Sequence, residues 1–84
     1  MRLVMVYREK SEVRMAAETF IRDFKKQTSG EIETIDPDTR DGAAFCDVYD
    51  VTNYPTLMAL TPEGTPTAIW RGTLPTIMDA SAYK

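Results

Sequence analysis

A proline at the head of an apolar strand constrains the fold of this chain more than any other feature. Residues 51–60 read Val-Thr-Asn-Tyr-Pro-Thr-Leu-Met-Ala-Leu. Because proline has no backbone N–H to donate within a sheet, Pro55 is expected to open the strand rather than to lie inside it. The cis form of a peptide bond before proline costs only about 0.5–1 kcal/mol. The sequence therefore predicts a tight turn at Tyr54–Pro55 that suits a cis bond.

The segment before this turn has the pattern of two strand-helix units. Residues 3–7 are continuously apolar, as expected for a central strand that is covered on both faces. Ser11 is then expected to be the N-cap of a helix, and Gly30 is expected to adopt the left-handed conformation that ends this helix. The apolar positions of this helix follow the spacing i, i+3, i+4, i+7, and they are Val13, Ala16, Ala17, Phe20, Ile21 and Phe24.

The second unit begins with residues 31–35, where polar and apolar side chains alternate as in a half-exposed edge strand. Residues 36–39 form a turn, and a second helix is expected from about Arg40 to Tyr49. Its apolar face is predicted to consist of Ala44, Phe45, Val48 and Tyr49.

The remainder of the chain predicts a hairpin and a short last helix. The strand after Pro55 runs to Leu60, residues 61–65 form the turn, and residues 67–70 form the fourth strand. The last helix is expected to have Pro75 in its first turn. The order βαβαββα predicts a single α/β domain over residues 1–84, with a four-stranded mixed sheet and helices on both faces.

Residues 49–57 resemble the cis-proline segment of the thioredoxin-like superfamily, which includes thioredoxins and glutaredoxins. In that segment a helix ends in an aromatic and aliphatic pair, a short loop follows, and Pro-Thr opens a strand, as Tyr49, Val51, Pro55 and Thr56 do here. Length, element order and proline position match the minimal thioredoxin-like domain over nearly the whole chain. The resemblance implies a thioredoxin-like fold.

The redox motif of that superfamily has no counterpart here. In its active members, Cys-x-x-Cys lies between the first strand and the first helix, where the helix N-terminus stabilises a thiolate. Residues 7–14 of this chain contain no cysteine, and Ser11 and Arg14 take the two thiol positions. A serine hydroxyl forms no disulfide, so the sequence predicts a redox-inactive protein without dithiol exchange.

Two weaker catalytic candidates remain. Ser11 is a helix cap in one interpretation; in another, by resemblance to the thioredoxin-like half of glutathione transferases, Ser11 or Tyr7 holds a bound thiolate. Cys46 is the only thiol, and the helical spacing places it on the flank of the second helix, partly exposed. Neighbouring Asp47 and Asp50 disfavour its thiolate. A monothiol or glutathione-dependent enzyme that uses Cys46 or Ser11 is therefore the alternative function.

Composition excludes several other classes of function. The net charge is −3 and the pI about 4.8, and no basic stripe suitable for nucleic acid is visible. No apolar run approaches the roughly 20 residues of a membrane span, and a cytoplasmic location is expected. The chain has no His and one Cys, and residues 36–42 fail the EF-hand spacing. Neither a metal nor a cofactor is expected.

The predicted function is a peptide-binding or protein-binding module. The resemblance implies that the backbone of the residue before the cis-proline pairs with an extended partner segment, a role that needs no cysteine. It would fall to Tyr54, with Asn53 and Pro55 beside it and Ser11 and Glu12 across the groove. Oligomeric state stays open: Trp70 and Tyr83 could pack in the core or anchor an interface.

Overall fold

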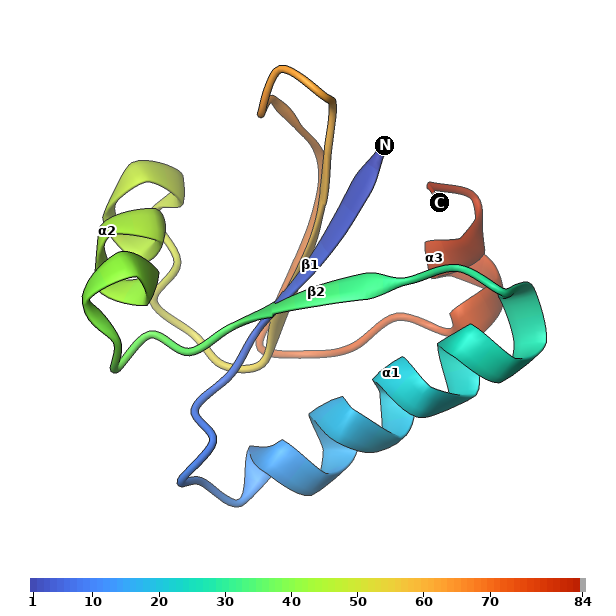
Figure 1. The fold of residues 1–84 in the computed structure, drawn as a ribbon, viewed down its shortest axis with the longest axis horizontal. Coiled ribbons are helices and arrows are strands. Elements are labelled where there is room, and N and C mark those ends of the chain that lie inside the picture. Colours follow the sequence, from blue (N-terminus) through green and yellow to red (C-terminus); the bar gives the residue numbers. More distant parts are fainter. Residues whose placement is uncertain (84) are drawn as a thin grey trace.

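The computed structural model describes residues 1–83, which form one mixed sheet with helices on both faces (Figure 1). The strand order is β2-β1-β3-β4, with β1 and β2 parallel and the other pairs antiparallel. This confirms the predicted α/β class, the central first strand and the second strand at an edge. In chain order the elements are β1 (Arg2–Val6), α1 (Val13–Thr28), β2 (Ile32–Ile35), α2 (Arg40–Tyr49), β3 (Thr56–Leu60), β4 (Pro66–Arg71) and α3 (Ile77–Ser81).

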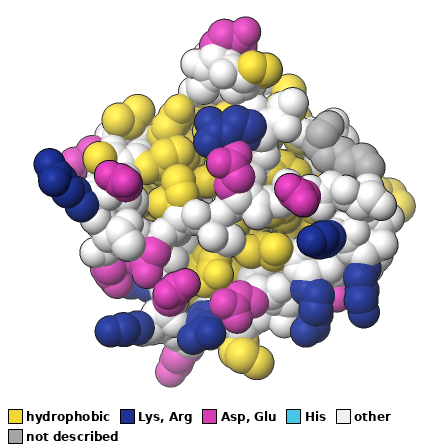
Figure 2. Space-filling view, viewed as in Figure 1, with side chains coloured by type: hydrophobic (Ala, Val, Ile, Leu, Met, Phe, Trp, Pro, Cys, Tyr) yellow, Lys and Arg dark blue, Asp and Glu magenta, His cyan; other side chains and the backbone are white. Residues whose placement is uncertain are grey.

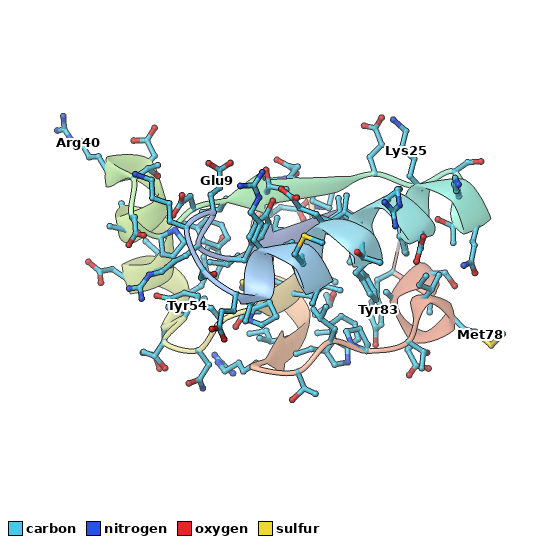
Figure 3. The ribbon with its side chains drawn as sticks, turned by 90° about the horizontal axis from the view of Figure 1, so that it is seen from below. Glu9, Lys25, Arg40, Tyr54, Met78 and Tyr83 are labelled. Atoms are coloured by element: carbon cyan, nitrogen blue, oxygen red, sulfur yellow. The ribbon has the colours of Figure 1, made fainter. Side chains whose placement is uncertain are left out.

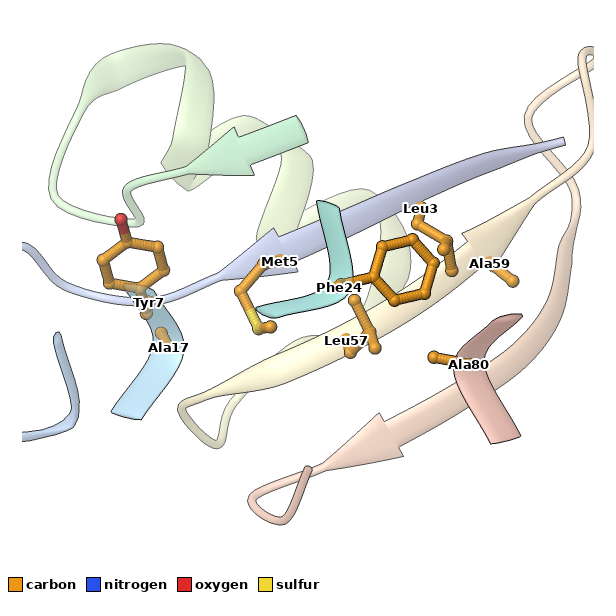
Figure 4. Packing of buried hydrophobic residues seen from close by; sticks show 8 residues of the cluster. All are labelled: Leu3, Met5, Tyr7, Ala17, Phe24, Leu57, Ala59 and Ala80. Carbon is orange, nitrogen blue, oxygen red and sulfur yellow. The ribbon is translucent and has the colours of Figure 1, made fainter. Parts of the chain in front are cut away.

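The alternation of side chains along β1 divides the core into two hydrophobic clusters. Leu3 and Met5 face α1 and α3, whereas Val4 and Val6 face α2. Figure 1 shows α2 on one side of the sheet, with α1 and α3 on the other. The cluster beneath α1 is centred on Phe24, which is fully buried (Figure 4). Continuous apolar strands thus produce a sheet covered on both faces.

Both ends of α1 differ from the prediction. Glu12 rather than Ser11 occupies the N-cap position, and it makes no side-chain capping bond. The Ser11 hydroxyl instead donates to the Arg8 carbonyl at 2.7 Å. At the C-terminus Ser29, not Gly30, is left-handed with φ 60°, and its N–H closes the last turn on the Lys25 carbonyl at 3.0 Å. Of the predicted apolar stripe, Ala16 is exposed.

The predicted bounds of α2 are confirmed, but its buried face is rotated. Gly42 and Cys46 are buried, while Val48 is 74% exposed and Ala44 is also exposed. The prediction that Cys46 is partly exposed and that Val48 lies on the buried face is therefore wrong. At Gly42 the helix lies against the Asp36 carbonyl, where a Cβ atom would overlap, and Cys46 on the same side packs in the cluster under the sheet. Phe45 and Tyr49 flank that line and pack on the same cluster.

The hairpin and the last helix lie close to the predicted positions. Gly64, with φ 88°, turns the chain between β3 and β4. Thr76 caps α3 by accepting from the Asp79 N–H at 3.1 Å, so Pro75 precedes the helix instead of lying in its first turn. Trp70 and Tyr83 meet edge to face at 5.6 Å between ring centroids and pack against the α1 cluster. Their geometry fits core packing.

Within residues 1–83, no helix is both long enough and apolar enough to span a membrane. On the face shown in Figure 2, acidic and basic side chains are interspersed. The cytoplasmic location stays a prediction.

Candidate functional site

The loop between α2 and β3 carries the predicted binding residues. The Tyr54–Pro55 peptide bond is cis, and Pro55 is buried. The loop is fixed on both sides of Tyr54, because the Thr56 hydroxyl donates to the Asn53 carbonyl at 2.6 Å and the Pro55 carbonyl accepts from the Gly72 N–H at 2.9 Å. Within residues 1–83, neither the N–H nor the carbonyl of Tyr54 makes a hydrogen bond. A rigid loop thus presents an unpaired donor and acceptor.

Arg8 lies over the Tyr54 side chain and connects it to a third loop. The Arg8 guanidinium carbon is 5.1 Å from the centroid of the Tyr54 ring, a cation–π distance. The same guanidinium donates from Nε to Asp38 Oδ1 at 3.1 Å. Both side chains of this ion pair are about half exposed, 50% and 56%, so the pair contributes at most about 1 kcal/mol. Its main effect is to position Arg8 over Tyr54.

Cys46 lies on the inner side of Tyr54. Only 8% of the residue is exposed, and burial raises the pKa of the thiol above its ordinary value. A hydrogen bond with Tyr54 and the positive charge of Arg8 lower that pKa by less, while Asp47 raises it further. The thiol is therefore neutral at pH 7, the opposite of the low-pKa, accessible thiolate that a catalytic cysteine provides.

This environment predicts slow alkylation of Cys46. Because the pKa of the folded thiol is raised, the thiolate forms only at higher pH than in the unfolded chain. When the rate of iodoacetamide reaction is measured against pH, we expect it to rise at a higher pH in the folded protein than in the urea-unfolded protein. At pH 7.5 the folded protein is expected to react at least about tenfold more slowly. Faster alkylation of the folded protein at that pH would show an activated nucleophile.

Ser11 and Glu12 are not joined to Tyr54 by any hydrogen bond within residues 1–83. They line a shallow, open hollow at the start of α1 with other side chains of that segment, including Arg14 and Met15. The Tyr54 side chain instead contacts Arg8 through its ring and Cys46 through its hydroxyl. Within residues 1–83 no hydrogen bond thus links the two sides of the predicted groove, and the groove stays a prediction.

The Tyr7 hydroxyl is also engaged. It donates to the Glu18 carboxylate at 3.4 Å, and only 5% of Tyr7 is exposed. Burial, followed by the charge of Glu18, raises the pKa of this phenol. Tyr7 is therefore a poor partner for a bound thiolate.

Sequence reasoning missed Arg8 and Asp38. A cation–π contact has no local sequence pattern, and an ion pair across 30 residues has none either. The available signal was topological: β1 and β2 are parallel neighbours, so the loops that follow them, which contain Arg8 and Asp38, leave the sheet at the same edge.

The remaining polar side chains of residues 1–83 form no metal centre. Within residues 1–83, no three His, Cys, Asp or Glu side chains gather closely enough to hold a metal ion. Figure 3 shows Glu9 and Tyr54 toward the α2 end of the molecule and Met78 and Tyr83 toward the α3 end.

Comparison with known proteins supports the fold alone. No family model matches the sequence, and no curated protein matches it significantly. Among solved structures, the chain is similar to thioredoxin 1 from the thermophilic eubacterium Thermosipho africanus, with a TM-score of 0.71 and 19% sequence identity. The match covers 99% of this chain and 89% of that one. The predicted thioredoxin-like fold is therefore confirmed.

Proposed function

We propose that this domain of thioredoxin-like fold binds an extended segment of a partner protein at Tyr54, without dithiol chemistry. The observation that carries the proposal is the unpaired N–H and carbonyl of Tyr54, held in a loop that hydrogen bonds fix on both sides. An extended chain beside them can form a short β-addition, in which main-chain hydrogen bonds supply the affinity. Because the loop is already ordered, little entropy is lost on binding.

The start of α1 supports the redox-inactive part of the proposal. Ser11 stands where a thiol would be needed, and its hydroxyl is committed to the Arg8 carbonyl at 2.7 Å. The only sulfur that could react, that of Cys46, is buried and has a raised pKa. A protein with one such cysteine has no internal partner for disulfide exchange.

The alternative, a monothiol or glutathione-dependent enzyme, has less support. It needs a nucleophile or a thiolate-stabilising hydroxyl that is accessible, whereas Ser11, Tyr7 and Cys46 each have their polar atom engaged or buried. Turnover of a glutathione substrate that is lost in either Cys46→Ser or Ser11→Ala would restore this alternative, and unchanged turnover in both variants would exclude both nucleophiles.

The binding proposal is tested by amide chemical shifts. ¹⁵N-labelled protein is titrated to millimolar concentration with a mixture of random ten-residue peptides. Shift changes are expected at residues 53–56 and at Arg8, because main-chain pairing at Tyr54 is independent of peptide sequence. The control is the same mixture with alternate backbone nitrogens methylated, which removes donors and blocks the pairing.

The methylated mixture is expected to leave residues 53–56 unchanged. Equal shifts with both mixtures would show that side chains rather than the backbone are recognised. Shifts confined to other faces of the domain, or none at millimolar peptide, would refute Tyr54 as the binding site.

A further inference from the structure

A pocket of about 470 Å³ lies where the β1–α1 and β2–α2 loops separate. The two parallel strands β1 and β2 are neighbours, but α1 and α2 cover opposite faces of the sheet, as Figure 1 shows. In open α/β sheets, a crevice opens outside the carboxyl ends of strands whose connections diverge in this way, and ligands bind there. The pocket has the size of small-molecule sites.

The chemistry of this pocket is acidic and partly apolar. Glu9, Asp36 and Asp41 supply carboxylates, while Ile35 and Phe45 supply apolar wall. No Lys or Arg lines it, and none of the three carboxylates takes part in an ion pair within residues 1–83. Three cations adjoin these carboxylates in sequence, namely Arg8, Lys10 and Arg40, and none of them lines the pocket. Arg8 is held by Asp38 and Tyr54.

The pocket suits an organic cation better than a metal ion. The carboxylates do not converge closely enough for a metal ion, since residues 1–83 contain no such cluster. They are instead spread around a pocket that has room for methylene groups against Ile35 and Phe45. A compact dication gains little from this arrangement, whereas an alkylammonium or guanidinium with an aliphatic stem matches both the charge and the apolar wall.

We infer that this pocket binds an organic cation of that class, as a free amine or as a lysine or arginine side chain of a peptide. The site is separate from Tyr54 and does not depend on the function proposed above. Glu9 from the β1–α1 loop and Asp41 from the first turn of α2 hold the charged end, and Ile35 and Phe45 contact the stem.

The test uses 1,5-diaminopentane, the tripeptide Ala-Lys-Ala and the neutral analogue 1,5-pentanediol, each titrated into ¹⁵N-labelled protein at low salt. We expect shift changes at residues 34–36 and 39–45 with the amine or the lysine peptide and none with the diol. Stronger binding of the diamine identifies a free amine as the ligand, and stronger binding of the peptide identifies a basic side chain. Binding of Mg²⁺ or Ca²⁺ with equal affinity would overturn the selection of an organic cation.

Two charge-matched double variants decide whether the pocket itself binds. Glu9→Gln with Asp41→Asn removes both proposed charge partners, whereas Glu31→Gln with Asp47→Asn removes the same two charges from exposed positions outside the pocket. The first is expected to weaken binding about tenfold and the second less than about twofold. Equal weakening in both variants, or no shift changes around the pocket with either cation, would overturn the inference.

Discussion

Replacing Phe24 with alanine is expected to lower the free energy of unfolding by about 3–5 kcal/mol. Phe24 is fully buried on α1, and its cluster joins the helix to β1, β3 and α3 (Figure 4). Truncation removes its ring contacts and leaves a cavity that rigid strands cannot close. A domain of this size has a total stability on the order of 10 kcal/mol or less, so the loss is a large fraction of the whole.

Urea denaturation followed by circular dichroism measures this loss. The matched control is Met15→Ala, which shortens a side chain of the same helix that is 74% exposed, and it is expected to change stability by less than about 0.5 kcal/mol. A similar small change in Phe24→Ala would mean that α1 does not pack on the sheet as described.

Replacing Gly42 with alanine is expected to destabilise the protein by about 2 kcal/mol or more, although alanine is the better helix former. A Cβ atom at Gly42 would overlap the carbonyl oxygen of Asp36 and lie 2.8 Å from Thr39 Oγ1. That carbonyl accepts from both the N–H and the hydroxyl of Thr39, at 3.1 and 2.8 Å. Relief of the overlap therefore disturbs the capping loop, and with it the N-cap bond from Gly42 N–H to Thr39.

Ala44→Gly on the exposed side of α2 provides the control. There glycine should be the less stable residue, by about 0.5–1 kcal/mol, because only helix propensity acts. In thermal or urea unfolding, glycine is thus expected to be more stable than alanine at position 42 and less stable than alanine at position 44. A stabilising Gly42→Ala would contradict the close approach of α2 to the Asp36 loop.

The element order was predictable because each segment carries a strong local pattern. Residues 3–7 and 57–60 are apolar throughout, α1 repeats its apolar residues at helical spacing, and Pro55 marks the start of a strand. These patterns act within a few residues of one another, where sequence spacing and spatial neighbourhood coincide. The position of the first strand between two others also follows, since only a covered strand is apolar on both faces.

The details that failed depend on individual contacts at the ends of the two long helices. The side of α2 that buries Cys46 and exposes Val48 also carries Gly42, which lies against the Asp36 carbonyl of the capping turn before the helix. Ser29 is left-handed in place of Gly30 because the Thr28 hydroxyl bonds both the Phe24 carbonyl and the Gly30 N–H. Neither arrangement produces a repeating pattern of residues that could be recognised in the sequence.

The candidate site divides in the same way. Tyr54 and Pro55 were identified from the sequence of their own segment. Arg8 contacts the Tyr54 ring and pairs with Asp38, and the loops that contain Arg8 and Asp38 are brought together by the parallel pairing of β1 and β2. Reading the ends of adjacent parallel strands as neighbours would have suggested the pair.

The most direct test of the central claim is hydrogen exchange of the Tyr54 backbone amide. In the free protein this N–H has no hydrogen-bond partner within residues 1–83 and is expected to exchange rapidly. A peptide bound by main-chain pairing would protect it by at least about tenfold while leaving the amides of α3 unchanged. Formation of a peptide complex with unchanged exchange at Tyr54 would contradict the account.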